Sequence, residues 1–388
     1  IQAQAKSYHR HLTTLPYHGS QPMERSDLGQ LLLVGVPGPE LDPETANVFR
    51  QIQPGGFVLF GRNIRTPSQL RKLVDDLRDL CATEPIIAID QEGGRVSRLK
   101  LIGNEPPNAQ QLRQKNDENL IRLHGELTGN LLRLFGFNLD LCPVLDISFA
   151  DEADNSLRGR CWGTSVPQVI QFAGAFHDGL LSTGVLTCGK HFPGYAAAGL
   201  DPHHDLPTID RSRTELEECE LKIFRAFVDR VSSMMIGHAW YPVLDPEKIP
   251  ASLSQRVVTD LLKEELGFKG LVMTDDLDMG AIINEVGFAE AISRAVTAGN
   301  DLAMICHRIA MVRDAYDTLR CLPSKLLDPA LSAIAEIKRH LAPPTSFSEE
   351  AFRSLDHQVW NLRVAALGPE LAKYRSPDDG KRSPVEVY

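Results

Sequence analysis

The sequence is short of basic residues and of long apolar runs. Its 388 residues include 41 lysines and arginines against 51 aspartates and glutamates, which gives a net charge of −10 at pH 7. Proteins that bind nucleic acid need a basic face, so this balance argues against a nucleic-acid partner. No apolar run approaches the roughly 18 residues that cross a bilayer. We therefore expect no association with a membrane.

Cysteines are few and show no pairing pattern. The seven are odd in number and widely spaced, and no CxxC pair occurs. This usage is typical of reduced thiols, and we expect a cytoplasmic protein. The printed chain begins at Ile1 and not at Met, which is also compatible with a signal peptide upstream.

Several cofactor and metal motifs are missing as well. The chain has no GxGxxG or GxxxxGK[ST] turn for a nucleotide and no HExxH pair for zinc. We therefore expect neither a cofactor nor a metal. A metal-dependent hydrolase with His191, His203, His204 and Asp205 as ligands is the alternative, because histidine and carboxylate clusters attract metals.

Short apolar runs that end in Gly, Pro or a polar residue recur along the chain. Several are nearly continuous in apolar residues, as buried parallel strands are. Helical patterns lie between them, such as the leucines at spacings of three and four within residues 120–134. The eight predicted strands span residues 31–35, 57–60, 86–90, 138–144, 185–190, 234–238, 271–274 and 302–305.

Eight strands alternating with helices predict an α/β fold, a single TIM-type (β/α)8 barrel without a second α/β sandwich domain. A doubly wound open sheet is the alternative. We expect residues 1–25 to form an N-terminal tail and residues 26–345 to form the barrel. Residues 346–388 are expected to form a C-terminal tail that is partly disordered, because the last residues are rich in Pro, Asp, Lys and Ser.

Polar residues cluster where these strands end. In such barrels the chemistry lies at the carboxyl ends of the strands, so the cluster predicts an active site there. Asp275 ends the seventh strand, while Asp201 and His203 follow the fifth strand on a loop rich in Gly and Ala. A proton donor and a fixed carboxylate are what cleavage of a glycosidic bond requires. The polar residues at the strand ends are Asp90, Asp146, Lys190, His191, His238, Asp275 and His307.

Longer motifs around these positions resemble glycoside hydrolase family 3, and most closely its bacterial β-N-acetylglucosaminidases of peptidoglycan recycling. They are DQEGGRVSR at 90–98, KHFPG at 190–194, DPH at 201–203 and TDDL at 274–277. Further matches are GFVLFGRN at 56–63, GFNLDLCPVLD at 136–146, PASLS at 250–254 and ELGFKGLVMTDD at 265–276. The resemblance covers about residues 28 to 310.

The resemblance implies roles for individual residues. Asp275 would be the nucleophile of a retaining reaction through a glycosyl-enzyme intermediate. His203 would be the acid and base, and Asp201 would orient its imidazole. The larger family members take this acid and base from a second domain, for which too few residues follow the eighth strand here. Sugar hydroxyls and an acetamido group would be bound by Asp90, Arg98, Arg160, Lys190 and His191.

The substrate implied is terminal β-linked N-acetylglucosamine on a small oligosaccharide or muropeptide, from peptidoglycan or chitin fragments. The loop at 194–200 reads GYAAAGL, where the family usually has polar residues, and this departure leaves a β-glucosidase as an alternative. A phosphorolytic β-glycosidase is another, because a histidine repels phosphate less than a carboxylate would. A catalytically inactive sugar-binding barrel is the third. We expect a monomer or a weak homodimer.

Overall fold

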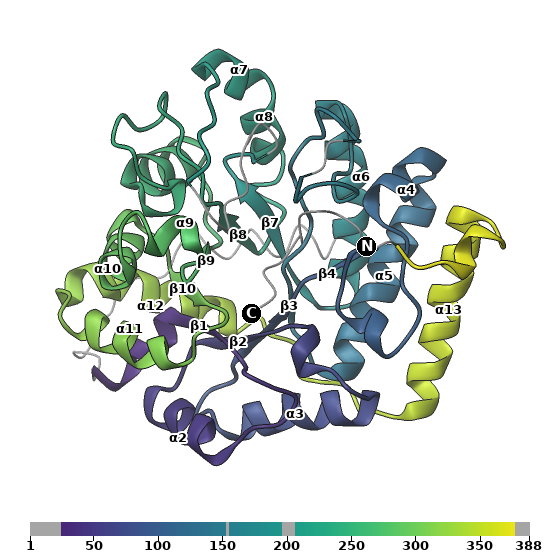
Figure 1. Ribbon diagram of the computed structural model, residues 1–388, viewed down its shortest axis with the longest axis horizontal. Coiled ribbons are helices and arrows are strands. Elements are labelled where there is room, and N and C mark those ends of the chain that lie inside the picture. Colours follow the sequence, from purple (N-terminus) through teal and green to yellow (C-terminus); the bar gives the residue numbers. More distant parts are fainter. Residues whose placement is uncertain (1–24, 153–154, 196–205, 377–388) are drawn as a thin grey trace.

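The computed structural model describes residues 25–152, 155–195 and 206–376. Within these ranges eight parallel strands form a closed barrel in the order β1-β10-β9-β8-β7-β6-β3-β2 (Figure 1). Each of the eight predicted strands coincides with one of them, which confirms the (β/α)8 barrel. The strands are β1 Leu32–Gly35, β2 Gly56–Leu59, β3 Ile86–Ile89, β6 Leu139–Asp140, β7 Leu186–Phe192, β8 Ser233–Ile236, β9 Leu271–Asp276 and β10 Leu302–Ile305.

The barrel closes because β1 pairs in parallel with both β2 and β10. This closure excludes the doubly wound open sheet. Strand β3, with the sequence IIAI, is buried at all four positions. Burial of both strand faces explains why the sequence shows continuous apolar runs and not an alternation of apolar and polar residues. A small antiparallel hairpin of β4 Gln91–Gly93 and β5 Val96–Ser97 follows β3 directly.

Helices surround the barrel (Figure 1). In chain order they are α2 Pro43–Ile52, α3 Pro67–Asp79, α4 Ala109–Lys115, α5 Glu118–Phe135, α6 Val166–Ser182, α7 Arg213–Glu218, α8 Glu220–Arg225, the π-helix η5 Arg256–Glu265, α9 Gly280–Ile283, α10 Phe288–Ala298, α11 Ala310–Arg320, α12 Ser324–Lys338 and α13 Glu349–Leu367. Short 3-10 turns include η1 Arg25–Leu31, η4 Ala251–Leu253 and η6 Leu371–Lys373. No helix of the described residues is long and apolar enough to cross a membrane.

Local signals in the sequence set the helix ends. Helix α5 begins where the Asp117 carboxylate accepts two main-chain N–H groups, and it ends at Gly136 with a φ of 89°. Gly136 has no Cβ, so it adopts this left-handed conformation without a steric cost. A capping box of Ser212 and Glu215 opens α7. The helical segment there is divided at Cys219 into α7 and α8.

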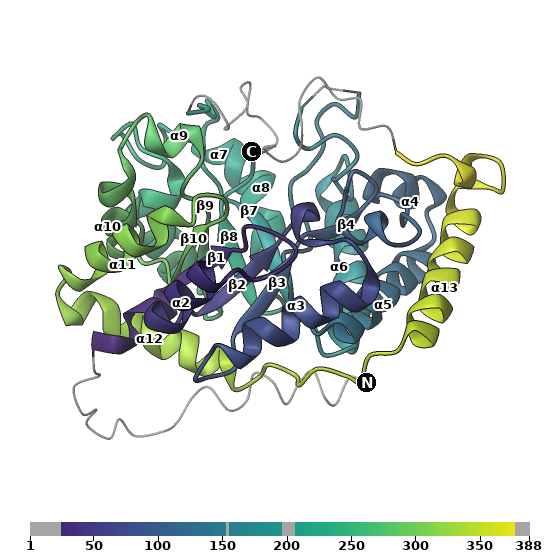
Figure 2. The same cartoon turned by 60° about the horizontal axis from the view of Figure 1, so that its bottom comes forward.

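The structure corrects the prediction for the C-terminal segment. Residues 346–388 were expected to be a tail, but α13 packs along α5 on the outside of the barrel (Figure 2). Phe352, Val359 and Leu362 are buried in this contact. Their spacing of seven and three residues fits one face of a helix, which accounts for the packing. Residues 377–388 and the expected tail of residues 1–24 lie outside the described residues.

A buried ion pair fastens α13 to the barrel. Arg363 Nη1 donates to the Glu105 carboxylate at 3.1 Å and to the Glu105 carbonyl at 2.9 Å, and both side chains are nearly inaccessible. Asn104, next to Glu105, donates its main-chain N–H to Asp356 Oδ1 at 2.6 Å. Helix α13 therefore holds the loop that follows the β4–β5 hairpin.

Removal of the Arg363 charge should lower the free energy of unfolding. In Arg363→Met the buried Glu105 carboxylate keeps only the Ser376 N–H at 2.8 Å and Lys100 at 3.8 Å, and loss of its close ion-pair partner costs about 3 kcal/mol. Urea unfolding followed by circular dichroism measures the change. Arg353→Met, at an exposed position of the same helix, is the matched control and should have little effect. Equal stability of the two variants would contradict this account of the ion pair.

Candidate active site

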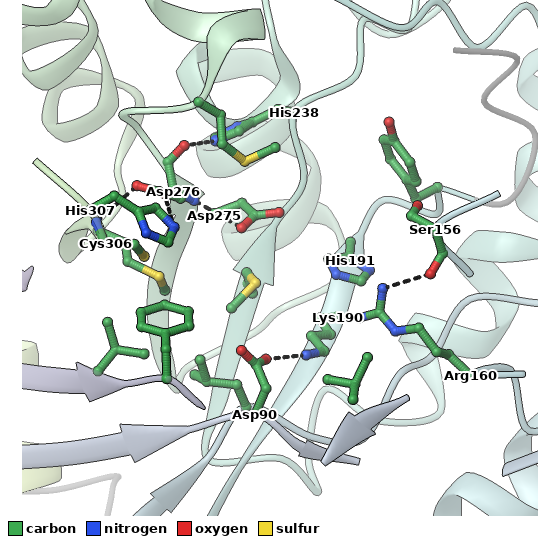
Figure 3. Close-up of a pocket in the computed structure, with 18 of the residues that line it drawn as sticks. Asp90, Ser156, Arg160, Lys190, His191, His238, Asp275, Asp276, Cys306 and His307 are labelled. Atoms are coloured by element: carbon green, nitrogen blue, oxygen red, sulfur yellow. Dashed lines mark hydrogen bonds and ion pairs between the residues drawn. The ribbon is translucent and has the colours of Figure 1, made fainter. Parts of the chain in front are cut away.

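One pocket opens at the carboxyl ends of the barrel strands (Figure 3). Asp90 follows β3, Lys190 and His191 lie near the end of β7, and Asp275 lies near the end of β9. All the predicted site residues within the described ranges line this pocket: Asp90, Arg98, Arg160, Lys190, His191 and Asp275. The remaining two, Asp201 and His203, lie outside the described residues.

Asp275 points into the pocket from the end of β9 (Figure 3). Its Oδ1 accepts the main-chain N–H of Asp276 at 2.8 Å. Burial acts to raise the pKa of Asp275, but His238, His191, the Asp276 N–H and Lys190 outweigh it and lower the pKa below its usual value. The carboxylate is therefore ionised at neutral pH, as a nucleophile must be.

A network of buried charges forms the opposite wall. Lys190 Nζ donates to Asp90 Oδ1 at 2.6 Å and contacts Glu92 Oε1 at 2.7 Å. Arg160 binds both carboxylate oxygens of Glu92 at 2.7 Å, and Arg98 Nη2 donates to Asp90 Oδ2 at 3.2 Å. Two carboxylates are thus shared among three cations, which keeps each charge paired away from water.

The network shifts the pKa values of its members. Burial alone would raise the pKa of Glu92, but Arg160 and Lys190 lower it to about 2. Burial likewise acts to lower the pKa of Lys190, and Asp90 and Glu92 overcome this effect and raise it. Every member therefore stays charged at neutral pH. The wall offers N–H donors and carboxylate acceptors together, the two kinds of group that bind sugar hydroxyls.

Sequence reasoning missed Glu92 as a member of the site. It lies between Asp90 and Arg98 in the motif that we singled out, on the β4–β5 hairpin. Gly93, next to it, has a φ of 111°, and a Cβ at this position would lie 2.3 Å from the Pro107 carbonyl oxygen. Only glycine fits this turn. The sequence did offer one signal for Glu92, a carboxylate directly before two glycines. Its ion-pair partners, Arg160 and Lys190, lie far away in the sequence, so the pairing could not be predicted.

His191 is held by a second carboxylate. Its Nδ1 lies 2.7 Å from Asp146 Oδ2, and the Asp146 side chain is fully buried. Asp146 Oδ1 accepts the main-chain N–H of Tyr195 at 2.6 Å. We predicted Asp146 as a polar strand-end residue but not as the partner of His191. The contact fixes the His191 ring and the main chain that leads toward residues 196–205.

Possible metal ligands come together at the edge of the pocket. Of the described residues, Asp276, Cys306 and His307 bring one potential ligand atom each within 4.8 Å of one another. The Arg62 guanidinium lies 2.9 Å from His307 Nδ1, and its positive charge disfavours a cation there. The metal-dependent hydrolase considered from the sequence would use four other ligands. Of these, His191 contacts Asp146, and His203, His204 and Asp205 lie outside the described residues.

Known proteins resemble this chain in sequence and in structure. The model of the glycosyl hydrolase family 3 N terminal domain matches residues 23–337. A beta-hexosaminidase of Tolumonas auensis is 32% identical over 305 residues, which make up 78% of this chain and 90% of that protein. The region that the family model matches includes all eight barrel strands and ends within α12, before α13.

Two solved structures share the fold. A glycoside hydrolase family 3 beta-N-acetylglucosaminidase from Paenibacillus sp. superposes with a TM-score of 0.79 at 30% identity, over 88% of this chain and 69% of that one. NagZ from Neisseria gonorrhoeae superposes with a TM-score of 0.74 at 27% identity, over 89% of this chain and 98% of that one.

The low pKa of Glu92 makes a pH-dependent contribution to stability. A folded-state pKa of about 2 lies below the unfolded value of about 4.3, so this stability is present above pH 4.3 and is lost as pH falls toward 2. Glu92→Gln should lower the free energy of unfolding at pH 7 by about 3 kcal/mol. The difference from wild type should shrink by about 2 kcal/mol between pH 5 and pH 3.

Urea unfolding at several pH values measures this difference. The matched control is Glu290→Gln, which removes one partner of an exposed ion pair with Arg294 on α10. It should change stability little at any of these pH values. A Glu92→Gln effect that is the same at pH 5 and pH 3 would show that Glu92 is not held ionised in the folded state.

Proposed function

This chain belongs to glycosyl hydrolase family 3, as its motifs predicted, and we propose that it is a retaining, exo-acting β-N-acetylglucosaminidase. The observation that carries the proposal is the ionised Asp275 carboxylate, which faces a wall of paired charges at the barrel's carboxyl end. The beta-hexosaminidase and beta-N-acetylglucosaminidase relatives support the choice of sugar. The substrate is terminal β-linked N-acetylglucosamine on a small oligosaccharide or muropeptide.

Asp275 is the nucleophile in this proposal. A carboxylate oxygen attacks the anomeric carbon, the bond to the leaving oxygen breaks, and a glycosyl-enzyme forms on Asp275. Water then attacks the anomeric carbon from the face that the leaving group vacated, the bond to Asp275 breaks, and the sugar is released with retained configuration. The positive potential of Lys190 helps to keep the carboxylate ionised, and it also favours departure of Asp275 when the ester is hydrolysed.

His203 supplies the proton in this proposal. Its imidazolium protonates the leaving oxygen, and the neutral ring then takes a proton from the attacking water. Asp201, two residues away, orients the ring and favours its protonated form. Their place in the chain supports these roles, because the segment that carries them follows Tyr195, which lines the pocket.

The paired-charge wall binds the sugar. Asp90 and Glu92 keep Lys190 and Arg160 in place, and Arg98 bonds Asp90 from the other side. Unused N–H groups of these cations and free lone pairs of the carboxylates are directed to hydroxyl groups and to the acetamido carbonyl. The fixed positions lower the entropy cost of binding a polar substrate.

We also propose a cellular setting for the protein. We place the protein in the cytoplasm as a monomer or weak homodimer, without nucleic-acid or membrane partners. All seven cysteines are free thiols, which fits a reducing compartment. No step of the proposed reaction uses a cofactor or a metal.

A panel of aryl β-glycosides tests the substrate. We expect the N-acetylglucosaminide to be cleaved with a kcat/KM at least about tenfold above that of the matching glucoside and xyloside, because a site built for the acetamido group leaves polar groups unpaired with the others. Assays with and without phosphate, with product analysis, separate hydrolysis from phosphorolysis. Equal or better turnover of the glucoside would overturn the N-acetylglucosamine assignment. Binding without cleavage of any glycoside would indicate an inactive sugar-binding barrel.

The role of His203 predicts a dependence on the leaving group. His203→Ala should lose about 100-fold or more in kcat on substrates with poor leaving groups and much less on activated aryl glycosides, which depart with little protonation. Asp201→Ala should lie between wild type and His203→Ala. The control is His340→Ala, at a partly exposed position near the end of α12, and it should leave the rates unchanged. Equal losses on both substrate classes would assign protonation to another residue, and His204 would be tested next.

A further inference from the structure

We propose that His238 is a positioning residue, which holds the Asp275 nucleophile in place through the main chain of Asp276. This inference rests on the proposed function, because it assigns a part in the attack by Asp275. His238 follows β8, is 1% exposed and lines the pocket beside Asp275. Figure 3 shows its ring directed toward the main chain of Asp276.

Both nitrogen atoms of the His238 ring have partners. Nε2 lies 2.8 Å from the Asp276 carbonyl oxygen, and Nδ1 lies 2.8 Å from the Ser252 hydroxyl. A carbonyl oxygen only accepts hydrogen bonds, so Nε2 carries the hydrogen. Burial is the largest influence on His238 and lowers its pKa, so at pH 7 the ring is neutral and Nδ1 is an acceptor; the ring is charged, and lowers the pKa of Asp275, only at the acid pH where Asp275 itself titrates. The Ser252 hydroxyl therefore donates to Nδ1.

Ser252 is itself fixed. It is fully buried in η4, and its carbonyl accepts the side-chain amide of Asn300 at 2.8 Å. The neighbouring Ala251 donates its main-chain N–H to the Ala239 carbonyl at 2.8 Å, which ties η4 to the segment that carries His238. These contacts give the PASLS motif a physical role: they place a hydroxyl donor that selects the Nε2–H tautomer of His238.

Asp276 links His238 to the nucleophile. Its main-chain N–H donates to Asp275 Oδ1, and its carbonyl accepts from His238. Its side-chain Oδ1 accepts the main-chain N–H groups of Asp278 and Cys306 at 3.1 and 3.0 Å. The side chain and the carbonyl are thus held from opposite sides, and together they fix the N–H group that orients Asp275.

Loss of the Nε2–H donor would release one restraint on the Asp276–Leu277 peptide unit, whose Leu277 N–H would still donate to the Met304 carbonyl at 2.9 Å. The Asp276 carbonyl could then tilt toward the pocket, and Asp276 would shift relative to Asp275. A misplacement of about 1 Å at a reacting group can cost roughly 100-fold in rate. The cost should fall on kcat and not on KM, because the sugar is held by the paired-charge wall around Lys190.

Two substitutions of His238 distinguish the effect of the Nε2–H donor from the effect of the size of the ring. A glutamine amide nitrogen reaches as far from Cα as the imidazole Nε2, whereas asparagine reaches only as far as Nδ1. His238→Asn should therefore lower kcat by about 10- to 100-fold with little change in KM. His238→Gln should restore kcat to within a few-fold of wild type. Ser252→Ala removes the tautomer-selecting donor and should lower kcat less than His238→Asn does.

A matched control shows whether the loss of any buried histidine lowers kcat. His177 is also buried, and its Nε2 contacts a main-chain carbonyl, that of Arg230 at 3.1 Å, but it does not line the pocket. His177→Asn should leave kcat unchanged. Thermal unfolding of each variant shows whether it is folded at the assay temperature. A covalent fluoroglycoside inactivator gives a second readout, because its inactivation rate depends on attack by Asp275.

The outcomes are distinct. A low kcat and slow inactivation for a folded His238→Asn, with recovery in His238→Gln, support the inference. A His238→Asn enzyme with the wild-type kcat overturns it, and so do equal losses in the asparagine and glutamine variants. A wild-type protein that cleaves none of the aryl glycosides would overturn the proposed function instead, and the role of His238 with it.

Discussion

Lys190 carries its ammonium group inside the protein, and the pocket is arranged around the two carboxylates that neutralise it. A buried cation without partners costs several kcal/mol, so Asp90 and Glu92 must lie beside Lys190 for the barrel to fold with this residue inside. Glu92 in turn pairs with Arg160, which approaches from the loop between β6 and α6. The ends of β3 and β7 and a distant loop are thereby brought to one place.

This arrangement explains why elements far from the pocket contribute to it. The β4–β5 hairpin that carries Glu92 is backed by the loop at residues 103–107, where Gly94 donates its N–H to the Pro106 carbonyl at 2.9 Å. Helix α13 holds the same loop through Arg363 and Glu105. The C-terminal helix, outside the region matched by the family model, thus helps to support the hairpin that positions Glu92. Rigid support of this kind is what a preorganised site requires.

Much of the fold and part of the site could be predicted from the sequence. The barrel strands were recognised because each is an apolar run that ends in Gly, Pro or a polar residue, and all six described site residues line one pocket. The partners of these residues could not be predicted. Lys190 and Asp90 lie 100 positions apart, and the contact depends on strand order and register. Helix α13 was missed because a polar terminal composition concealed the spacing of Phe352, Val359 and Leu362.

In the proposed reaction Asp275 becomes covalently bonded to the sugar. A 5-fluoro N-acetylglucosaminyl fluoride should inactivate the enzyme by accumulating this intermediate, because the fluorine slows its hydrolysis. Proteolysis and mass spectrometry then identify the modified residue. We expect one adduct, located on Asp275 and not on the adjacent Asp276, whose carboxylate oxygen Oδ1 is occupied by main-chain N–H groups. An adduct on any other carboxylate, or steady turnover with no adduct on Asp275, would contradict it.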